Sequence, residues 1–201
     1  MTAEWLAAIA SIGTFIVIAA TAIAALIQLR HMRSSNQIAA LNELRETIES
    51  EYFRDAAEFV HKDLPGLLSD PQVRSEIAAG TRVPAIKELT PAATLADFFE
   101  QCGTFVKHGI IEPQLFCDLW SYNVMIDWEA IAPLVTNLRA MQNLPALWEN
   151  FEYLASISRA YQAKYGDGNY PAGASREVMP PLWPEVAAAI SKRNDAENIT
   201  G

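Results

Sequence analysis

The sequence is poor in the residues from which most catalytic and metal sites are built. It has three histidines and two cysteines among 201 residues. Cys102 and Cys117 do not form a Cys-x-x-Cys pair, which argues against the common zinc and redox motifs and against a disulfide framework. We expect them to be small buried side chains in a reducing cytosol. P-loop, His-Glu-x-x-His and Gly-x-Ser-x-Gly motifs are also absent, so the sequence indicates no cofactor.

Positive charge is scarce as well. The chain has 24 Asp and Glu residues against 15 Lys and Arg, a net charge of −9 at pH 7. A negative field repels phosphates, so we expect no nucleic acid partner and no binding to a flat anionic membrane surface. Glu58 and His61 have the Glu-x-x-His spacing of di-iron bundles, but no second copy of that pair exists. A metal site is therefore not predicted.

Charge is missing altogether from residues 5–29, which are mostly apolar. As a helix, 25 residues at about 1.5 Å each can cross a hydrocarbon layer of about 30 Å. Arg30 and Arg33 follow the run and no basic residue precedes it, which predicts an N-terminus outside and a cytosolic remainder. A cleaved signal peptide is the alternative, but it favours a basic start and a shorter apolar core. We therefore predict a membrane anchor at residues 1–30.

No stretch shows the alternation of a β-strand, whereas helical periodicity is widespread. Residues 31–64 predict a stalk helix that continues the anchor and packs on the bundle through Leu41, Leu44, Ile48, Tyr52 and Phe59, with a break near Ser34 and Ser35 as an option. Residues 65–193 predict a cytosolic helical domain, and 194–201 a flexible tail. The predicted fold is all-α, a single transmembrane helix joined to a helical bundle.

Proline, glycine and capping residues place the helices of that domain. The expected ranges are 71–79, 90–108, 113–141, a helix between Pro145 and Gly166, and a short closing helix over 182–192. The 113–141 helix is apolar on two sides, which predicts a central position. Pro133 lies inside this helix and predicts a kink.

Glu100 stands beside Phe98 and Phe99 in the 90–108 helix. A buried carboxylate needs a partner, so we expect a structural ion pair with Lys107 or Arg139. The alternative is a carboxylate-lined catalytic cleft that uses Glu100, Asp118 or Asp127. We predict that the protein is not an enzyme.

Residues 89–155 resemble a bacterial membrane-anchored family catalogued as domain of unknown function 4760. The matching positions are Phe98, Phe99, Glu100, Val106, Gly109, Ile111, Leu115, Trp128, Pro133, Arg139, Phe151, Glu152 and Leu154. The resemblance implies an all-helical bacterial membrane protein, here in the inner membrane, and it implies no particular activity.

One side of the anchor carries Ala7, Ser11, Thr14, Ile18, Thr21, Ala25 and Gln28, and all of these except Ile18 are small or polar. Such faces associate helices in lipid, so we expect a homo-oligomer, most simply a dimer. The alternative is that the hydroxyls bond back to their own helix.

The leading functional hypothesis is an interaction protein that presents a cytosolic domain to an unidentified protein partner. A membrane effector of a bacterial stress or phage-defence system is the second hypothesis, and the carboxylate enzyme is the third.

Overall fold

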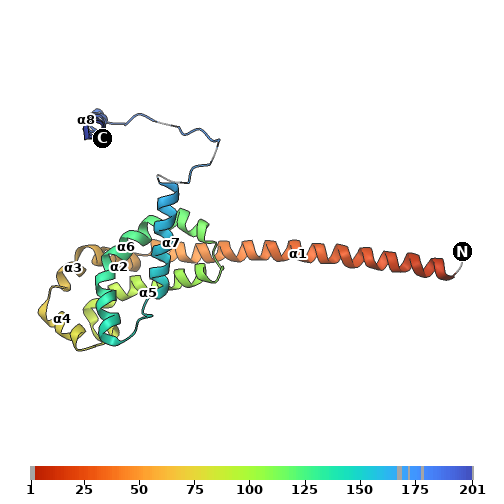
Figure 1. Cartoon of the computed structure of the whole chain (residues 1–201), viewed down its shortest axis with the longest axis horizontal. Coiled ribbons are helices and arrows are strands. Elements are labelled where there is room, and N and C mark those ends of the chain that lie inside the picture. The colour runs from red at the N-terminus through yellow and green to blue at the C-terminus, as the bar shows by residue number, and fades with distance from the viewer. Residues whose placement is uncertain (1–2, 167–168, 172, 178, 201) are drawn as a thin grey trace. The chain divides into compact units, whose positions relative to one another are not determined.

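The computed structural model describes residues 3–166, 169–171, 173–177 and 179–200, and for residues 6–9, 84 and 194–200 it describes the backbone alone. All the regular structure in these ranges is helical, which confirms the predicted all-α class. The chain divides into two units, Met1–Gly168 and Asn169–Gly201. The first unit holds the long N-terminal helix and the bundle (Figure 1).

Helix α1 (Ala3–Glu49) is 47 residues long and extends well beyond the other helices of its unit (Figure 1). It passes through Ser34 and Ser35 without a break, so the optional break at that point is not present. Its apolar part is exposed, whereas Leu44 near its other end is 2% exposed and packs in the core. The anchor segment and the first part of the stalk are therefore one helix, long and apolar enough to cross a membrane.

The stalk ends at Ser50, and this corrects the prediction of one helix to Leu64. Ser50 has extended backbone angles, and its hydroxyl accepts a hydrogen bond from the Phe53 amide at 3.2 Å, which caps α2 (Glu51–Lys62). Because α1 ends before Ser50 and α2 begins after it, the residues of α2 that face the core do not continue the apolar face of α1. Phe53 is consequently buried, and Tyr52, which was expected in the core, is 66% exposed.

Short elements connect α2 to the main bundle. They are α3 (Leu64–Leu67), α4 (Pro71–Ala78) and the 3₁₀ turns η1 (Val83–Ala85) and η2 (Lys87–Leu89). Helix α4 confirms the predicted helix over 71–79. It starts there because the Asp70 carboxylate accepts hydrogen bonds from the amides of Gln72 and Val73, at 2.7 and 3.2 Å.

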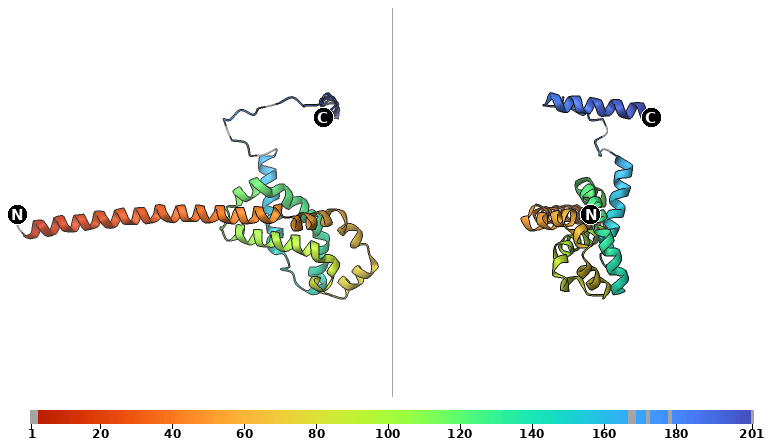
Figure 2. Two further views of the ribbon diagram at one scale, coloured as in Figure 1. Left: turned by 180° about the vertical axis from the view of Figure 1, so that it is seen from behind. Right: turned by 90° about the vertical axis from the view of Figure 1, so that its left-hand side faces the viewer.

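Three longer helices complete the bundle: α5 (Thr90–Lys107), α6 (Pro113–Gln142) and α7 (Glu149–Tyr165). Their ends agree closely with the predicted ones, although Thr90 lies inside α5 instead of capping it. These three helices pack against one another, and α1 leaves the bundle that they form, as the two further views in Figure 2 show. Aromatic rings from four helices meet in the core, at Phe53, Phe98, Phe99, Trp128 and Phe151.

Helix α6 packs against α2, α4, α5 and α7, as a central helix should. One of its two predicted faces is buried, and it includes Val124, Ile131 and Val135. The other is only partly so, because Leu119 and Tyr122 are 53% and 66% exposed. The helix runs on through Pro133 to Gln142.

The second unit contains α8 (Pro184–Thr200). A helix was expected here from Leu182 to Lys192, with a flexible tail after it. The observed helix starts at Pro184 and its backbone continues as far as Thr200. Gly201 lies outside the described residues.

Candidate functional site

A cleft opens between the end of α1, α2 and α6. Its volume is about 250 Å³, and Phe99 of α5 closes its inner side. The residues that line it are Ile48, Phe53, Arg54, Ala57, His61, Phe99, Trp120, Asn123, Ile126 and Asp127. Most of these side chains are apolar or aromatic, and four are polar. This composition, apolar walls with a few placed polar groups, is typical of a binding site.

The helix break at Ser50 creates the cleft. Ile48 lies just before the break and Phe53 just after it, and both line the cavity. A second cleft of about 420 Å³ continues along α1 and is lined by Ile38, Leu41, Asn42, Arg45, Ile48, Glu49, Leu119 and Trp120. Because Ile48 and Trp120 belong to both cavities, the two clefts adjoin along the same groove.

The polar centre of the cleft is a pair formed by His61 of α2 and Asp127 of α6. His61 Nε2 lies 2.6 Å from Asp127 Oδ1. The Asp127 side chain is 7% exposed and that of His61 38%, so the histidine separates the carboxylate from solvent. Burial raises the pKa of Asp127, although the hydrogen bond and charge of His61 oppose the shift. The pair thus places a carboxyl group with a raised pKa, that of Asp127, in the wall of a largely apolar cavity.

A histidine oriented by a carboxylate is also the arrangement of a general base. The carboxylate enzyme alternative therefore has one residue in a suitable place, Asp127. The described lining residues, however, include no serine, threonine or cysteine that could act as a nucleophile. Of the other two candidates, Asp118 accepts a hydrogen bond from the Tyr161 hydroxyl at 2.6 Å. Neither Asp118 nor Glu100 lines this cleft.

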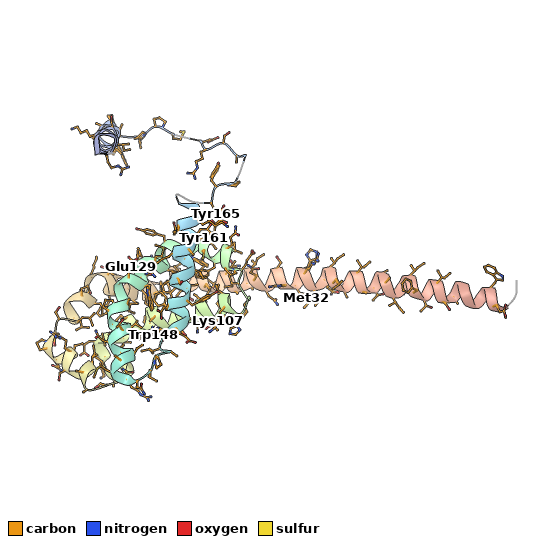
Figure 3. All side chains as sticks on the ribbon, in the orientation of Figure 1. Met32, Lys107, Glu129, Trp148, Tyr161 and Tyr165 are labelled. Atoms are coloured by element: carbon orange, nitrogen blue, oxygen red, sulfur yellow. The ribbon has the colours of Figure 1, made fainter. Side chains whose placement is uncertain are left out.

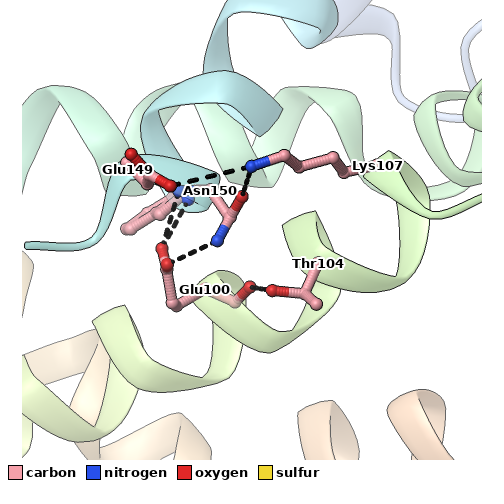
Figure 4. A network of polar contacts seen from close by, with 6 residues as sticks. Glu100, Thr104, Lys107, Glu149 and Asn150 are labelled. Atoms are coloured by element: carbon pink, nitrogen blue, oxygen red, sulfur yellow. Dashed lines mark hydrogen bonds and ion pairs between the residues drawn. The ribbon is translucent and has the colours of Figure 1, made fainter. Parts of the chain in front are cut away.

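Glu100 has other partners than the Lys107 or Arg139 that the sequence suggested (Figure 4). Its carboxylate accepts hydrogen bonds from the backbone amides of Asn150 and Phe151, at 2.8 and 2.9 Å, and from the Asn150 side chain at 2.7 Å. These amides belong to the first turn of α7, whose donors have no partner within the helix. Glu100 therefore caps α7 from the neighbouring helix.

The two expected partners of Glu100 take part in adjacent contacts. Lys107 donates to Asn150 Oδ1 at 3.1 Å and lies 3.6 Å from Glu149, as Figure 4 shows. Arg139 donates to Glu152 at 2.6 Å and to the Leu147 carbonyl at 2.8 Å. The structure thus brings Glu100 and Lys107 into one polar network through Asn150, and it places Arg139 in another.

The two residues of the Glu-x-x-His pair have different partners. Glu58 forms an ion pair with Lys62 at 2.6 Å on the exposed face of α2, whereas His61 turns to Asp127. Among the described residues, no group of three or more His, Cys, Asp or Glu could hold a metal ion. Cys102 and Cys117 are buried as expected, and burial raises the pKa of both thiols.

The predicted association face lies on the exposed length of α1. The hydroxyls of Thr14 and Thr21 donate to the carbonyls of Ala10 and Val17, at 2.9 and 2.8 Å. Both therefore make the intrahelical bonds of the alternative interpretation. Ser11, Ala25 and Gln28 are exposed on the same helix, and the side chain of Ala7 lies outside the described residues.

A family model for a domain of unknown function, DUF4760, matches residues 15–158, which is more than half of the chain. The chain belongs to this family. The match takes in part of the apolar segment of α1 and every residue that lines the cleft, so the DUF4760 unit joins the apolar helix to the bundle. It gives no positive indication of enzymatic activity. No significant match was found among curated proteins or among solved structures.

Proposed function

We propose that this DUF4760 protein is a single-pass protein of the bacterial inner membrane that presents a helical binding domain to a cytosolic protein partner. Three observations support a binding role: the long apolar helix, the bundle attached to it, and the partly open cleft. The cleft carries the proposal. Its polar groups are suited to recognition, and its described residues include no serine, threonine or cysteine nucleophile.

An apolar helix face is the partner that fits the groove best. The two adjoining clefts follow α1 from Ile38 to Ile48 and then reach His61. A helix laid along this line would place successive apolar side chains against Trp120 and Leu119, which is the helix-in-groove mode of recognition. Asn123 and Arg54 would supply hydrogen bonds at one end.

A photo-crosslinking amino acid at Asn123, in the full chain in its membrane, tests the cleft. Glu88 is a matched control because it is exposed and lies in η2, away from the cleft. We expect a discrete crosslinked product from position 123, absent from position 88 and reduced by Trp120→Ala. Identical products from both positions would contradict the proposal.

The orientation follows from Arg30 and Arg33, which lie on one side of the apolar run. A C-terminal reporter that is active only in the cytoplasm should work. High activity of a periplasm-only reporter at the same position would reverse the proposed topology.

Self-association through α1 is part of the proposal, with a dimer as the simplest form. Ser11, Thr14 and Thr21 present small side chains on one face, and small residues allow helices to approach closely in lipid. Their hydroxyl oxygens can still accept a bond from a second copy. We expect Thr14→Leu with Thr21→Leu to weaken crosslinking between copies in the membrane. Ile16→Leu with Ile23→Leu is the control, and equal crosslinking in the two double variants would refute this face.

A further inference from the structure

One end of the bundle lies close to the point where α1 leaves it. The turn between α5 and α6, residues 107–111, forms this end. Arg33 of α1 donates from Nη2 to the carbonyl of Gly109 at 3.4 Å. Figure 3 shows Lys107 at this end of the bundle and Met32 on the length of α1 just beyond it.

The contact fixes the distance of the turn from a membrane that α1 would span. Arg33 follows the last residue of the apolar run, Leu29, by four positions, or about 6 Å along the helix. The headgroup region of each leaflet is about 5–7 Å deep. With Leu29 at the edge of the hydrocarbon, Arg33 lies at the depth where the headgroups end, and Gly109 lies within one arginine side chain of it.

The turn is held firmly and exposes an apolar side chain. Gly109 takes a left-handed conformation with φ of +67°, which ends α5. The amides of Ile110 and Ile111 both donate to the Phe105 carbonyl, at 2.9 and 3.3 Å. Ile111 is fully buried as a result, whereas Ile110 is 47% exposed at the tip.

The charge of the turn differs from that of the whole domain. Residues 107–111 contain Lys107 and His108 and no carboxylate. Glu149 lies 3.6 Å from Lys107, and Glu112 begins the next segment, so the surroundings are close to neutral. The strong repulsion expected between an acidic protein and lipid phosphates is therefore weak here. An exposed isoleucine beside basic groups suits a membrane interface.

From this geometry we propose that the α5–α6 turn contacts phospholipid headgroups, with Ile110 inserted among them and Lys107 and His108 beside lipid phosphates. The turn would then hold the bundle at a fixed angle against the bilayer. This inference rests on the membrane anchoring proposed above.

Spin labels on introduced cysteines test the two proposals separately. The full chain is placed in vesicles of phosphatidylethanolamine and phosphatidylglycerol, with single labels at Ile110→Cys, Glu88→Cys or Val17→Cys. The unaltered protein is the blank, since both native thiols are buried. Collision with oxygen, which concentrates in lipid, is compared with collision with a water-soluble nickel complex.

We expect the label at position 17 to be deep in the bilayer, the one at 88 to be in water, and the one at 110 to have an intermediate ratio. Glu88 precedes the other end of α5, whose 18 residues span about 27 Å. A label at 110 that matches the one at 88, with 17 deep, would overturn the contact and leave the anchor intact. A label at 17 in water would overturn both. Ile110→Ser in a chain labelled at His108→Cys should shift that label toward water if insertion of Ile110 holds the turn.

Discussion

Helices α1 and α6 are both long and rich in apolar residues, yet their surroundings are opposite. In α6, apolar side chains such as Val124 and Ile131 are fully buried against other helices. In α1, Phe15 and Val17 are 73% and 65% exposed, and no residue of its most apolar window is buried. A soluble monomer rarely exposes a continuous apolar surface of that size. The comparison shows that apolar content alone does not distinguish a core helix from an exposed apolar helix, whereas burial does.

The largest change in the free energy of unfolding should come from removing a buried aromatic ring from α6. Trp128 is 8% exposed and packs edge-on against Phe151. Trp128→Ala should lower the free energy of unfolding by about 3–5 kcal/mol, because it leaves a cavity. Urea titration of the detergent-solubilised chain, followed by far-UV circular dichroism, measures this. Phe15→Ala in α1 should leave the bundle transition unchanged, and an equal loss in both variants would remove the contrast.

The matching change in α1 should affect membrane insertion instead. Val17→Arg puts a charge near the middle of the apolar run, at a cost of about 2.5–3.5 kcal/mol. The fraction of protein that resists alkaline extraction from membranes should fall. Tyr122→Arg on α6 is the control, since Tyr122 is already 66% exposed. Full retention of the Val17→Arg protein would argue against a spanning α1.

A smaller effect is expected from Glu100, which joins the buried helices to each other. Glu100→Ala leaves the amides of Asn150 and Phe151 without their acceptor. The loss should be about 1–3 kcal/mol. Faster hydrogen exchange should be confined first to the start of α7. Gln101→Ala on the exposed side of the same helix should change neither quantity.

The smallest effect concerns Asp127. Its pKa is raised in the folded protein, so the fold binds this proton more readily than the unfolded chain does. Its contribution to the free energy of unfolding is therefore greatest below the ordinary aspartate pKa of 3.8 and is lost as pH rises through the raised pKa. Asp127→Asn cannot titrate and should flatten this part of the pH dependence, whereas Asp118→Asn should not. If the free energy of unfolding of Asp127→Asn depended on pH in the same way as that of the unaltered protein, the raised pKa of Asp127 would be contradicted.

The fold was largely predictable because its signals are local. Pro71, Pro113 and Gly109 mark helix ends through backbone geometry that each residue imposes by itself. The break at Ser50 was missed because the helical spacing of apolar residues continues on both sides of it. A serine within such a pattern can either continue the helix or cap the next one. Only packing of Phe53 on Phe98 and Phe99 decides between them.

The candidate site was predictable only in fragments. His61 and Asp127 were each noticed, but they are 66 positions apart and form a pair only when α2 packs on α6. Glu100 was recognised as a carboxylate in need of partners. Those partners include backbone N–H groups, which every residue except proline carries, so no side-chain pattern could reveal them. Gly103 is a similar case, because a Cβ there would collide with the Asn150 carbonyl.

Helix α1 is continuous from Ala3 to Glu49, so it fixes the rotation of the bundle relative to the apolar segment about the helix axis. Leu44 fixes one end in the bundle, while Thr14 and Thr21 lie on the other part of the same helix. One residue inserted near Ser35 would rotate the bundle by about 100° relative to the face of these threonines and move it by about 1.5 Å. In the proposed dimer, the length of this segment would therefore determine which side of the bundle faces the second copy.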